Sequence, residues 1–410
     1  MTDAPRSVAV FCMGGDGHFQ RLHPIIVGLV GRGIAVNVFT QRTFAAAIGR
    51  AGGIFHDLFG AYPLEAADDR SVPVPCRWVT YAATFADQIS RDVAATGPSL
   101  VIHDLFAVIG RVVAHRLGLP RVTVCAGHNV VPQRYLEMLP RDPRVRIAPE
   151  CLRAVEVLRE SCGIADASPF CYVAGLSPSL NLYCEPPEFL HEDERPPFAP
   201  LAFFGSIPAA DGGGRIDRAG LPRSSLRTDR KRRIFVSFGT VIWWYYAADA
   251  VRALTALTTA CARRDDLRMI VSLGGASIAP EQVAALTHAN VAVEPYVDQW
   301  RLLQEADAVV THHGLNSTHE AIFHRVPMIS YPFFWDQPAL ARRAQAFGLA
   351  VPLVALPRGA VCVADVDAAL DRLAAEAVPM HAALARARQW ELAVMADRPA
   401  VLQQVVDLMA

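Results

Sequence analysis

The sequence predicts an α/β fold made of two Rossmann-like, doubly wound domains that face a cleft. Short apolar runs that suit buried strands alternate with longer runs that suit helices, which is typical of a parallel sheet covered on both faces. This alternation occurs twice along the 410 residues, and the length itself suggests two or three domains. A stretch poor in apolar residues, with three consecutive glycines at 212–214, separates the halves and indicates a linker or exposed loop.

Each half follows the same order of strand, loop and helix. Residues 130–200 are less regular and rich in proline and charge, so helices and loops are expected there. The chain is therefore divided into an N-terminal domain (1–207), a linker (208–233), a C-terminal domain (234–380) and a final helix (381–410). The predicted strands span 8–13, 36–39, 100–103, 121–125, 234–238, 269–273, 291–293, 308–310 and 328–331, and the predicted helices span 22–32, 108–117, 247–263, 300–305 and about 381–409.

Composition excludes several classes of protein. The net charge of −1 gives no sign of a nucleic-acid partner, no run of 18 apolar residues predicts a bilayer span, and the first residues do not resemble a signal peptide. Lys231 is the only lysine and follows no glycine-rich phosphate loop, which excludes a P-loop NTPase and a protein kinase. Nine cysteines without a Cys-x-x-Cys pair favour buried thiols in a reducing cytoplasm.

The most informative segment is 311–337, which reads THHGLNSTHEAIFHRVPMISYPFFWDQ. An apolar strand ends near His312 and Gly314, and a polar turn then opens a helix that is expected to carry Glu320 in its first turn. Small residues at a strand-to-helix turn leave amide groups at the positive end of the helix dipole, where they suit an anion. His312 adds a side-chain donor, and Glu320 adds an acceptor where a ribose would lie. The segment therefore predicts a site for a nucleoside diphosphate that carries a polar group.

This segment resembles the donor-binding motif of the family 1 glycosyltransferases, which use UDP- or dTDP-sugars and include plant, animal and bacterial antibiotic enzymes. The family pattern is a His-Gly-Gly stretch, then Asn-Ser, a Glu and a terminal Asp-Gln. Here His313 stands in place of the first of those glycines. The resemblance implies the GT-B fold, with the last helix crossing back onto the first domain. The matching positions are His312, Gly314, Asn316, Ser317, Glu320, Asp336 and Gln337.

Two residues in the first half are candidates for proton transfer. His18 follows a glycine-rich turn at the end of the first strand, where open α/β sheets bind ligands, and an imidazole accepts a proton near neutral pH. Asp104 ends a later strand and would orient that imidazole if the two strands are neighbours. A helix-capping role is the alternative for each residue. His103 is the fallback for Asp104, although strand alternation directs it elsewhere.

The resemblance assigns the general base and its carboxylate partner to His18 and Asp104. One departure from the family is the proline that usually lies three residues after the histidine, since Pro24 lies six residues after His18.

Further candidates for donor binding lie at the strand ends of the second half. Hydroxyl and amide groups after the first strand of this half would reach the phosphates, and a later segment stands where the resemblance implies a Trp-x-Pro-Gln stretch that holds the base. Tyr296 would stack on the base and the Val297 backbone would read its edge, with ordinary packing as the alternative for Tyr296. These candidates are Ser237, Gly239, Thr240, Tyr296, Val297 and Gln299.

The resemblance also implies roles for residues that contact the sugar. Glu320 would bind the ribose, Asp336 and Gln337 the hydroxyl groups of the sugar, and Trp335 would cover the sugar's face. An acceptor pocket is expected in the first domain, because aromatic and apolar side chains usually line small-molecule sites. Core packing is the alternative for its aromatic candidates. The acceptor candidates are Gly17, Trp78, Tyr81, Phe85, Phe106 and His128.

These expectations describe an inverting, metal-independent hexosyltransferase that transfers a sugar from a UDP- or dTDP-sugar to a hydroxyl of a lipophilic natural product. The protein is expected to be a cytoplasmic bacterial enzyme, a monomer or homodimer, with no cofactor and no nucleic-acid partner. Alternatives with the same fold are a nucleotide-sugar 2-epimerase, which needs catalytic carboxylates in the cleft, and a transferase for lipid-linked cell-wall precursors, which needs an exposed apolar and basic patch. A non-catalytic ligand-binding or partner protein is the alternative from another class.

Two motifs resemble other sites but fail their spacing. His319 and His324 lie five residues apart, which places them about 140° apart around a helix and prevents them from sharing a metal ion. The glycines at 14–17 resemble a dinucleotide-binding loop, but Gln20 stands where its last glycine is required.

Overall fold

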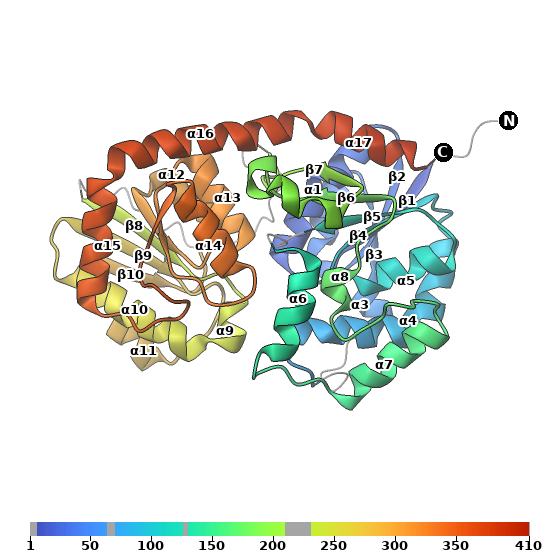
Figure 1. Ribbon diagram of the computed structural model, residues 1–410, viewed down its shortest axis with the longest axis horizontal. Helices are drawn as coiled ribbons and strands as arrows, with labels where there is room; N and C mark the ends of the chain where they lie inside the picture. Colours follow the sequence, from blue (N-terminus) through green and yellow to red (C-terminus); the bar gives the residue numbers. More distant parts are fainter. Residues whose placement is uncertain (1–5, 64–69, 126–129, 210–230, 410) are drawn as a thin grey trace. The chain divides into compact units, whose positions relative to one another are not determined.

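The computed structural model describes residues 6–63, 70–125, 130–209 and 231–409 (Figure 1). The chain divides into two compact units, the first formed by Met1–Ile216 with Val394–Ala410 and the second by Asp217–Ala393. Each unit is built on one parallel sheet, so the predicted class of two Rossmann-like domains is confirmed. Within the described part, no helix combines the length and apolar character that a membrane span requires.

The first unit has a parallel sheet in the order β3-β2-β1-β4-β5-β6-β7. β1 and β4 are buried along their whole lengths, as expected for strands that are covered on both faces. The strand order changes direction between β1 and β4, where open parallel sheets bind ligands beyond their carboxyl ends. The strands are β1 (Ser7–Phe11), β2 (Ala35–Thr40), β3 (Ile54–Asp57), β4 (Leu100–Asp104), β5 (Arg121–Cys125), β6 (Leu180–Tyr183) and β7 (Leu201–Phe203).

Helices cover this sheet, and α4 packs against both α5 and α7 (Figure 1). The helices are α1 (Asp16–Val30), α2 (Ala45–Arg50), α3 (Leu58–Ala61), α4 (Arg77–Ala94), α5 (Val108–Arg116), α6 (Pro132–Met138), α7 (Pro149–Glu160) and α8 (Cys171–Ala174), with 3-10 turns at Arg42–Phe44, Val74–Cys76, Leu139–Arg141, Pro187–Phe189, Glu192–Glu194 and Pro196–Phe198.

The end of the chain returns to the first unit. A single helix was predicted over about 381–409, but the structure has two helices, α16 (Ala377–Ala396) and α17 (Arg398–Asp407). The break occurs because Pro399 has no amide hydrogen, so it lies in the first turn of a new helix. Arg398 is buried and donates hydrogen bonds to the carbonyl oxygens of Phe204, Ile207 and Pro208 at 2.8, 2.5 and 3.0 Å. These bonds fix α17 to the last strand of the sheet.

The second unit has a parallel sheet in the order β10-β9-β8-β11-β12-β13, and its order changes direction between β8 and β11. The strands are β8 (Arg232–Ser237), β9 (Leu267–Ser272), β10 (Val291–Glu294), β11 (Ala308–Thr311), β12 (Met328–Ser330) and β13 (Ala350–Pro352). The helices are α9 (Ile242–Tyr245), α10 (Ala247–Ala262), α11 (Pro280–Leu286), α12 (Gln299–Glu305), α13 (Leu315–His324), α14 (Gln337–Ala346) and α15 (Val363–Ala375).

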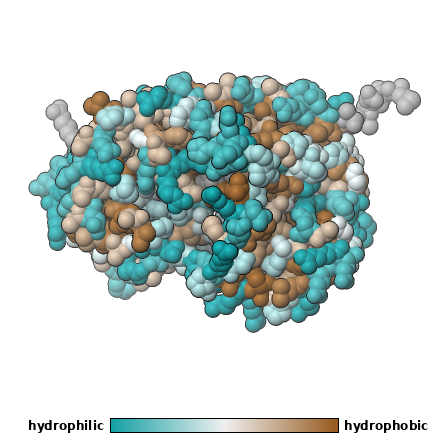
Figure 2. Space-filling view, viewed as in Figure 1, coloured by the Kyte–Doolittle hydropathy of each residue, from teal (hydrophilic) through white to brown (hydrophobic). Residues whose placement is uncertain are grey.

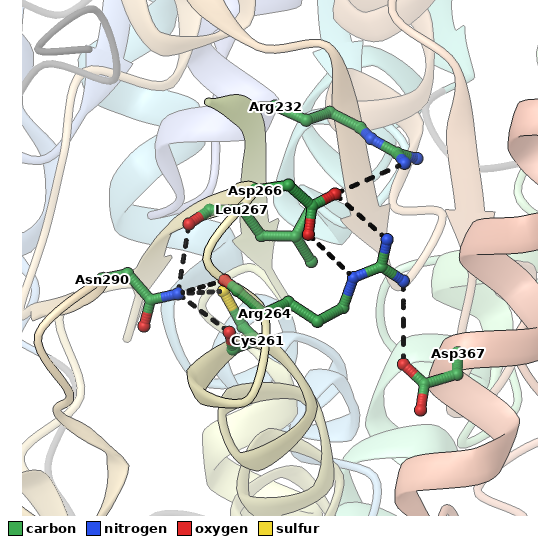
Figure 3. Close-up of polar contacts among 7 residues, drawn as sticks. All are labelled: Arg232, Cys261, Arg264, Asp266, Leu267, Asn290 and Asp367. Atoms are coloured by element: carbon green, nitrogen blue, oxygen red, sulfur yellow. Dashed lines mark hydrogen bonds and ion pairs between the residues drawn. The ribbon is translucent and has the colours of Figure 1, made fainter. Parts of the chain in front are cut away.

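A polar network stabilises the amino ends of β9 and β10, which lie opposite the carboxyl ends of the strands (Figure 3). Asn290 donates from Nδ2 to the carbonyl oxygens of Cys261, Arg264 and Leu267 at 2.8, 3.0 and 3.1 Å. These bonds connect Asn290, the residue before β10, to the end of α10, the turn after it and the first residue of β9. Arg264 also pairs with Asp266 at 3.1 Å.

The exposed large apolar side chains in the described part of the first unit are Val27 of α1, Ile54 of β3, Met138 of α6, and Leu152 and Val157 of α7. On the face shown in Figure 2, hydrophobic residues lie among hydrophilic ones. All nine cysteines are free and eight of them are buried, which matches the prediction of buried thiols.

Candidate active site

His18 lies at the start of α1, immediately beyond the carboxyl end of β1. The sequence predicted a loop over 14–17 and a helix from residue 22, and this boundary is wrong because the helix begins at Asp16 and includes Pro24. An acidic residue in the first turn is favourable at the positive end of the helix dipole, and it starts the helix ahead of the proline. His18 and Gly17 are therefore helical residues of the first turn.

Asp104 ends β4, and β4 pairs directly with β1, so the predicted neighbourhood of the two strands is confirmed. Asp104 Oδ2 lies 2.8 Å from His18 Nδ1, although the ring N–H is angled away from that oxygen. Asp104 Oδ1 accepts a hydrogen bond from the Phe106 amide at 3.1 Å. The second oxygen thus fixes the turn before α5, while the first faces the imidazole.

The carboxylate of this pair is buried and the imidazole is partly open to solvent, with side-chain exposures of 2% and 24%. Burial alone would raise the pKa of Asp104, but the interactions with His18 and the Phe106 amide outweigh it and lower the pKa. Asp104 is therefore an ionised carboxylate next to Nδ1, which leaves Nε2 of His18 as the nitrogen that can take a proton. This is the arrangement of a general base with an orienting carboxylate.

His103 points away from this pair, as strand alternation predicted. Its Nδ1 lies 2.9 Å from the Asp104 carbonyl oxygen, and its Nε2 lies 3.2 Å from Thr123 Oγ1 and 3.3 Å from an Arg121 nitrogen. Burial, together with the Arg121 charge, lowers the pKa of His103 to about 3. His103 is a neutral histidine of the core.

The predicted acceptor residues fall into two groups. Phe106 lies next to the catalytic candidate, with its ring centroid 4.9 Å from that of His18. Trp78, Tyr81 and Phe85 instead form an aromatic cluster along α4 and α3, with Tyr81 in contact with both of the others. His128 lies outside the described residues.

Tyr81 is a packing residue. Its side chain is 2% exposed, and its hydroxyl donates to the carbonyl oxygen of Tyr62 at 3.2 Å. Core packing was the alternative for the aromatic acceptor candidates, and the burial of Tyr81 agrees with that alternative. Trp78 and Phe85 are half-buried.

In the second unit, three loops meet at the carboxyl ends of β8, β9 and β11. His312 follows β11, and its imidazole lies between Gly239 and Gly314. A β-carbon at residue 239 would lie 2.7 Å from His312 Nε2, and one at residue 314 would also overlap that nitrogen. Gly274 is equally constrained, because a β-carbon there would overlap the Gly239 carbonyl. The sequence analysis missed Gly274, although two glycines directly after a predicted strand are a usable signal.

His312 is a neutral side chain in this cradle. Burial lowers its pKa to about 4, partly opposed by an interaction with the Ser237 backbone. Its Nδ1 makes no well-directed hydrogen bond. The imidazole can therefore donate an N–H to an anion, but it does not carry a positive charge near neutral pH.

The helix α13 begins next to this imidazole. It starts at Leu315, with Gly314 at its N-cap and without a capping side chain. The predicted polar turn over 315–318 is therefore already helical, so Asn316 and Ser317 lie in the first turn and Glu320 lies in the second turn rather than the first. The first amide groups of a helix have no partner within the helix and suit an anion.

Glu320 and Gln299 were predicted as separate donor contacts, but the structure joins them. Gln299 Nε2 donates to Glu320 Oε2 at 2.7 Å, and Ser317 Oγ lies 3.4 Å from Gln299 Oε1. Glu320 is 2% exposed. The pair links α12 to α13, close to His312. The bond was not predictable from the sequence because the two residues lie 21 positions apart.

The loop after β12 contains the predicted sugar contacts. Gln337 is buried, and its Oε1 accepts from the amides of Phe333 and Phe334 at 3.0 and 3.3 Å. The side-chain carbonyl of Gln337 therefore holds the loop, and the contact of Gln337 with sugar hydroxyls stays a prediction. Trp335 and Asp336 are half-buried at the start of α14, and Trp335 has a left-handed backbone with φ 55°.

The remaining donor candidates differ in exposure. Ser237 is buried, and its Oγ accepts from the Gly239 amide at 3.3 Å, so its hydroxyl shapes the turn. Thr240 is exposed, whereas Tyr296 is half-buried and Val297 is buried.

Comparisons with known proteins agree with this arrangement. A family model described as UDP-glucoronosyl and UDP-glucosyl transferase matches residues 273–381. The NDP-glycosyltransferase YjiC of Bacillus subtilis (strain 168) is 24% identical over 370 residues, which cover 88% of this chain and 87% of that protein. The solved glycotransferase of kitacinnamycin has a TM-score of 0.73 at 22% identity, with 98% of this chain and 99% of that chain covered. The spinosyn rhamnosyltransferase complexed with thymidine diphosphate has a TM-score of 0.62 at 19% identity, with 97% and 99% covered.

The matched residues 273–381 include His312, Gly314 and Glu320, and the fold of two parallel-sheet units agrees with the structural neighbours over the whole chain. Residues 273–381 therefore match a glycosyltransferase family model, and the chain has the GT-B fold of its structural neighbours.

Proposed function

We propose that this glycosyltransferase transfers a hexose, with inversion, from a UDP- or dTDP-sugar to a hydroxyl of a lipophilic small molecule. The single observation that carries this proposal is the pair of His18 and Asp104 at the point where the strand order of the first sheet reverses. A protein that only binds a ligand does not need a base with an orienting carboxylate.

The first step is proton transfer at the acceptor. His18 Nε2 takes the proton of the acceptor hydroxyl, and the ionised Asp104 stabilises the imidazolium that forms. The acceptor oxygen attacks the anomeric carbon as the bond from that carbon to the diphosphate oxygen breaks. A single displacement of this kind inverts the configuration, and the nucleoside diphosphate leaves with the bonding electron pair.

The second unit offers groups that stabilise the leaving diphosphate. The neutral His312 donates an N–H, and the amide groups at the start of α13 add further donors at the positive end of the helix dipole. The exposed Thr240 hydroxyl can reach the same anion. Preorganised donors of this kind lower the barrier without a metal ion, so the proposal is metal-independent.

The nature of the substrates follows from similarity and from the site. The matching family is described by UDP-linked donors, and one structural neighbour holds thymidine diphosphate, which supports either nucleotide. Asp336 offers a carboxylate for a sugar that retains its hydroxyl groups. The names of two neighbours refer to kitacinnamycin and spinosyn, which supports a lipophilic acceptor, and Phe106 beside His18 is an apolar side chain that would contact one.

A cytoplasmic location is part of this proposal and is supported by the nine free cysteines. The apolar side chains exposed in the described part of the first unit are spread over α1, β3, α6 and α7, which favours a small-molecule acceptor over a membrane-anchored one.

The direct test is donor turnover with and without EDTA. UDP-glucose and dTDP-glucose are incubated with the protein and a panel of aromatic and macrolide alcohols, and nucleoside diphosphate release is measured. Acceptor-dependent release that EDTA does not change is the expected result. Release that disappears with EDTA and returns with a divalent cation would contradict the metal-independent mechanism, and no release with any sugar would contradict the function.

A further inference from the structure

His313 is a strained residue inside the diphosphate cradle. Its backbone has φ 59°, in the left-handed region that a residue with a β-carbon rarely adopts. The family pattern has a glycine at this position, where such a conformation is unstrained. A strained residue persists only where its surroundings fix it, so the imidazole of His313 must be held by strong local contacts.

The imidazole of His313 is fully buried, and both ring nitrogens have partners. Nδ1 lies 3.2 Å from Thr318 Oγ1 and Nε2 lies 2.8 Å from Ser330 Oγ. The backbone amide of His313 also donates to Thr311 Oγ1 at 3.2 Å. One residue thereby joins the end of β11, the first turns of α13 and the end of β12.

The direction of each hydrogen bond follows from Thr318. Its single hydroxyl hydrogen is donated to the Gly314 carbonyl at 3.1 Å, so Thr318 Oγ1 must accept from His313 Nδ1–H. The Nε2 atom is then an acceptor, and Ser330 donates to it. Burial, together with the nearby His312 and His319, lowers the pKa of His313 to about 3, which keeps this neutral tautomer throughout the usual pH range.

The contacts of His313 determine where the groups that face the diphosphate lie. His312 precedes it in the chain, and Gly314, the N-cap of α13, follows it. The imidazole of His312 has little freedom between Gly239 and Gly314, so a small change of the turn at 313 would displace either the imidazole or the first amides of α13.

We propose that His313 is a positioning residue: its neutral, doubly hydrogen-bonded imidazole fixes the turn that presents His312 Nε2 and the amide groups of α13 to the donor diphosphate. This inference rests on the proposed function, because it assigns the cradle to the nucleotide. His313 itself does not contact the donor, and it acts through its neighbours.

The test compares His313→Gly, which matches the family pattern and relieves the backbone strain, with the wild-type protein in titrations with UDP and dTDP. The loss of two positioned hydrogen bonds should raise the Kd for the preferred nucleotide about tenfold, a change of about 1.4 kcal/mol. His313→Asn should recover part of the affinity, because asparagine tolerates the left-handed conformation and keeps a donor toward Thr318. The KM for the donor should rise with the Kd, while the KM for the acceptor stays unchanged.

Thr258→Val is the matched control for a purely structural effect. Thr258 is a fully buried residue of α10 in the same unit, and its hydroxyl lies 3.4 Å from the Thr255 carbonyl. This variant should lower the melting temperature while the nucleotide Kd stays at the wild-type value. A wild-type Kd in His313→Gly would overturn the inference alone. Failure of the wild-type protein to bind either nucleotide would overturn the inference and the proposed function together.

Discussion

His18 follows β1 in the first sheet and His312 follows β11 in the second, and the surroundings of the two histidines differ. Each lies beyond the carboxyl end of a strand at the point where the strand order of its sheet reverses. His18 is partly exposed and faces an ionised carboxylate, whereas His312 is 8% exposed and lies between two glycines. Burial lowers the pKa of His312 and disfavours its imidazolium form.

This difference shows that the location of a histidine in the fold determines whether it lies where ligands bind. The groups around its side chain then determine its role. In the proposed mechanism, the carboxylate next to Nδ1 makes the first histidine a proton acceptor. Burial without such a partner lowers the pKa of the second histidine, and in the proposal this neutral imidazole donates one hydrogen bond to the diphosphate.

The largest expected effect comes from Asp104→Asn, which removes the charge that distinguishes the first histidine. Transfer should fall about 10³-fold, because the amide does not stabilise the imidazolium and favours the wrong tautomer. The UDP Kd should stay at the wild-type value, as measured by titration calorimetry. The amide oxygen can still accept the Phe106 N–H, so the turn before α5 is preserved. A loss of transfer smaller than about tenfold would mean that Asp104 only holds that turn.

Acid should destabilise the protein through its buried neutral histidines. The pKa of His312 is lowered to about 4 and those of His103 and His313 to about 3, so the unfolded chain binds more protons between about pH 6.5 and those values. Stability is therefore complete above about pH 6.5 and is lost as the pH falls, by an amount on the order of 3 kcal/mol for His312. The lowered pKa of Asp104 adds a loss at still lower pH, as its carboxylate is protonated.

Melting curves recorded at intervals from about pH 7 down to pH 4.5 measure this acid effect. His312→Gln removes one of the buried imidazoles and should flatten the curve of melting temperature against pH. A melting temperature that does not change over this range would contradict the burial of these histidines as neutral groups.

Gly314→Ala tests the glycine cradle without changing a polar group. The new β-carbon would overlap His312 Nε2 and displace the imidazole, so the UDP Kd should rise about tenfold. Gly49→Ala is the matched control, because a β-carbon at that helical position meets nothing within 4 Å. Equal UDP affinity in both variants would show that the position of His312 does not determine donor binding.

The smallest effect should come from a change at the amino ends of the strands of the second sheet. Asn290→Ala removes three hydrogen bonds to carbonyl oxygens of the network in Figure 3. The second unit should lose about 1 kcal/mol of stability, because water can replace part of these bonds at a half-buried position. Thermal melting measures this loss, and the UDP Kd below the melting temperature should be unchanged. A weaker Kd would mean that the amino and carboxyl ends of the strands are energetically coupled.

The sheets were predictable from the sequence because their strands are continuous apolar runs. The predicted strand over 100–103 is β4, and the predicted strand over 234–238 is β8, each within two residues at either end. The helix starts were less predictable. Residues 14–17 were predicted as a loop and residues 315–318 as a turn, but α1 begins at Asp16 and α13 begins at Leu315.

The residue types at the site were predictable, but their contacts with one another were not. Gln337 and Glu320 were expected to face the donor because the motif contains them, and the structure shows each with an internal partner. Tyr81 is an aromatic residue that could line a pocket or pack in the core, and only its burial distinguishes the two. His313 replaces a glycine, and its strained backbone and buried bonds cannot be inferred from a substitution in a motif.

The most direct test of the separate roles proposed for the two histidines uses the variant His18→Ala. This variant is assayed for both glycosyl transfer and UDP binding. The expected result is a loss of transfer of about 10³-fold with a wild-type Kd for UDP, because the base is removed while the diphosphate cradle of the second unit is intact. Retained transfer would contradict the role of His18 as the base, and a parallel loss of UDP binding would contradict the separation of the two sites.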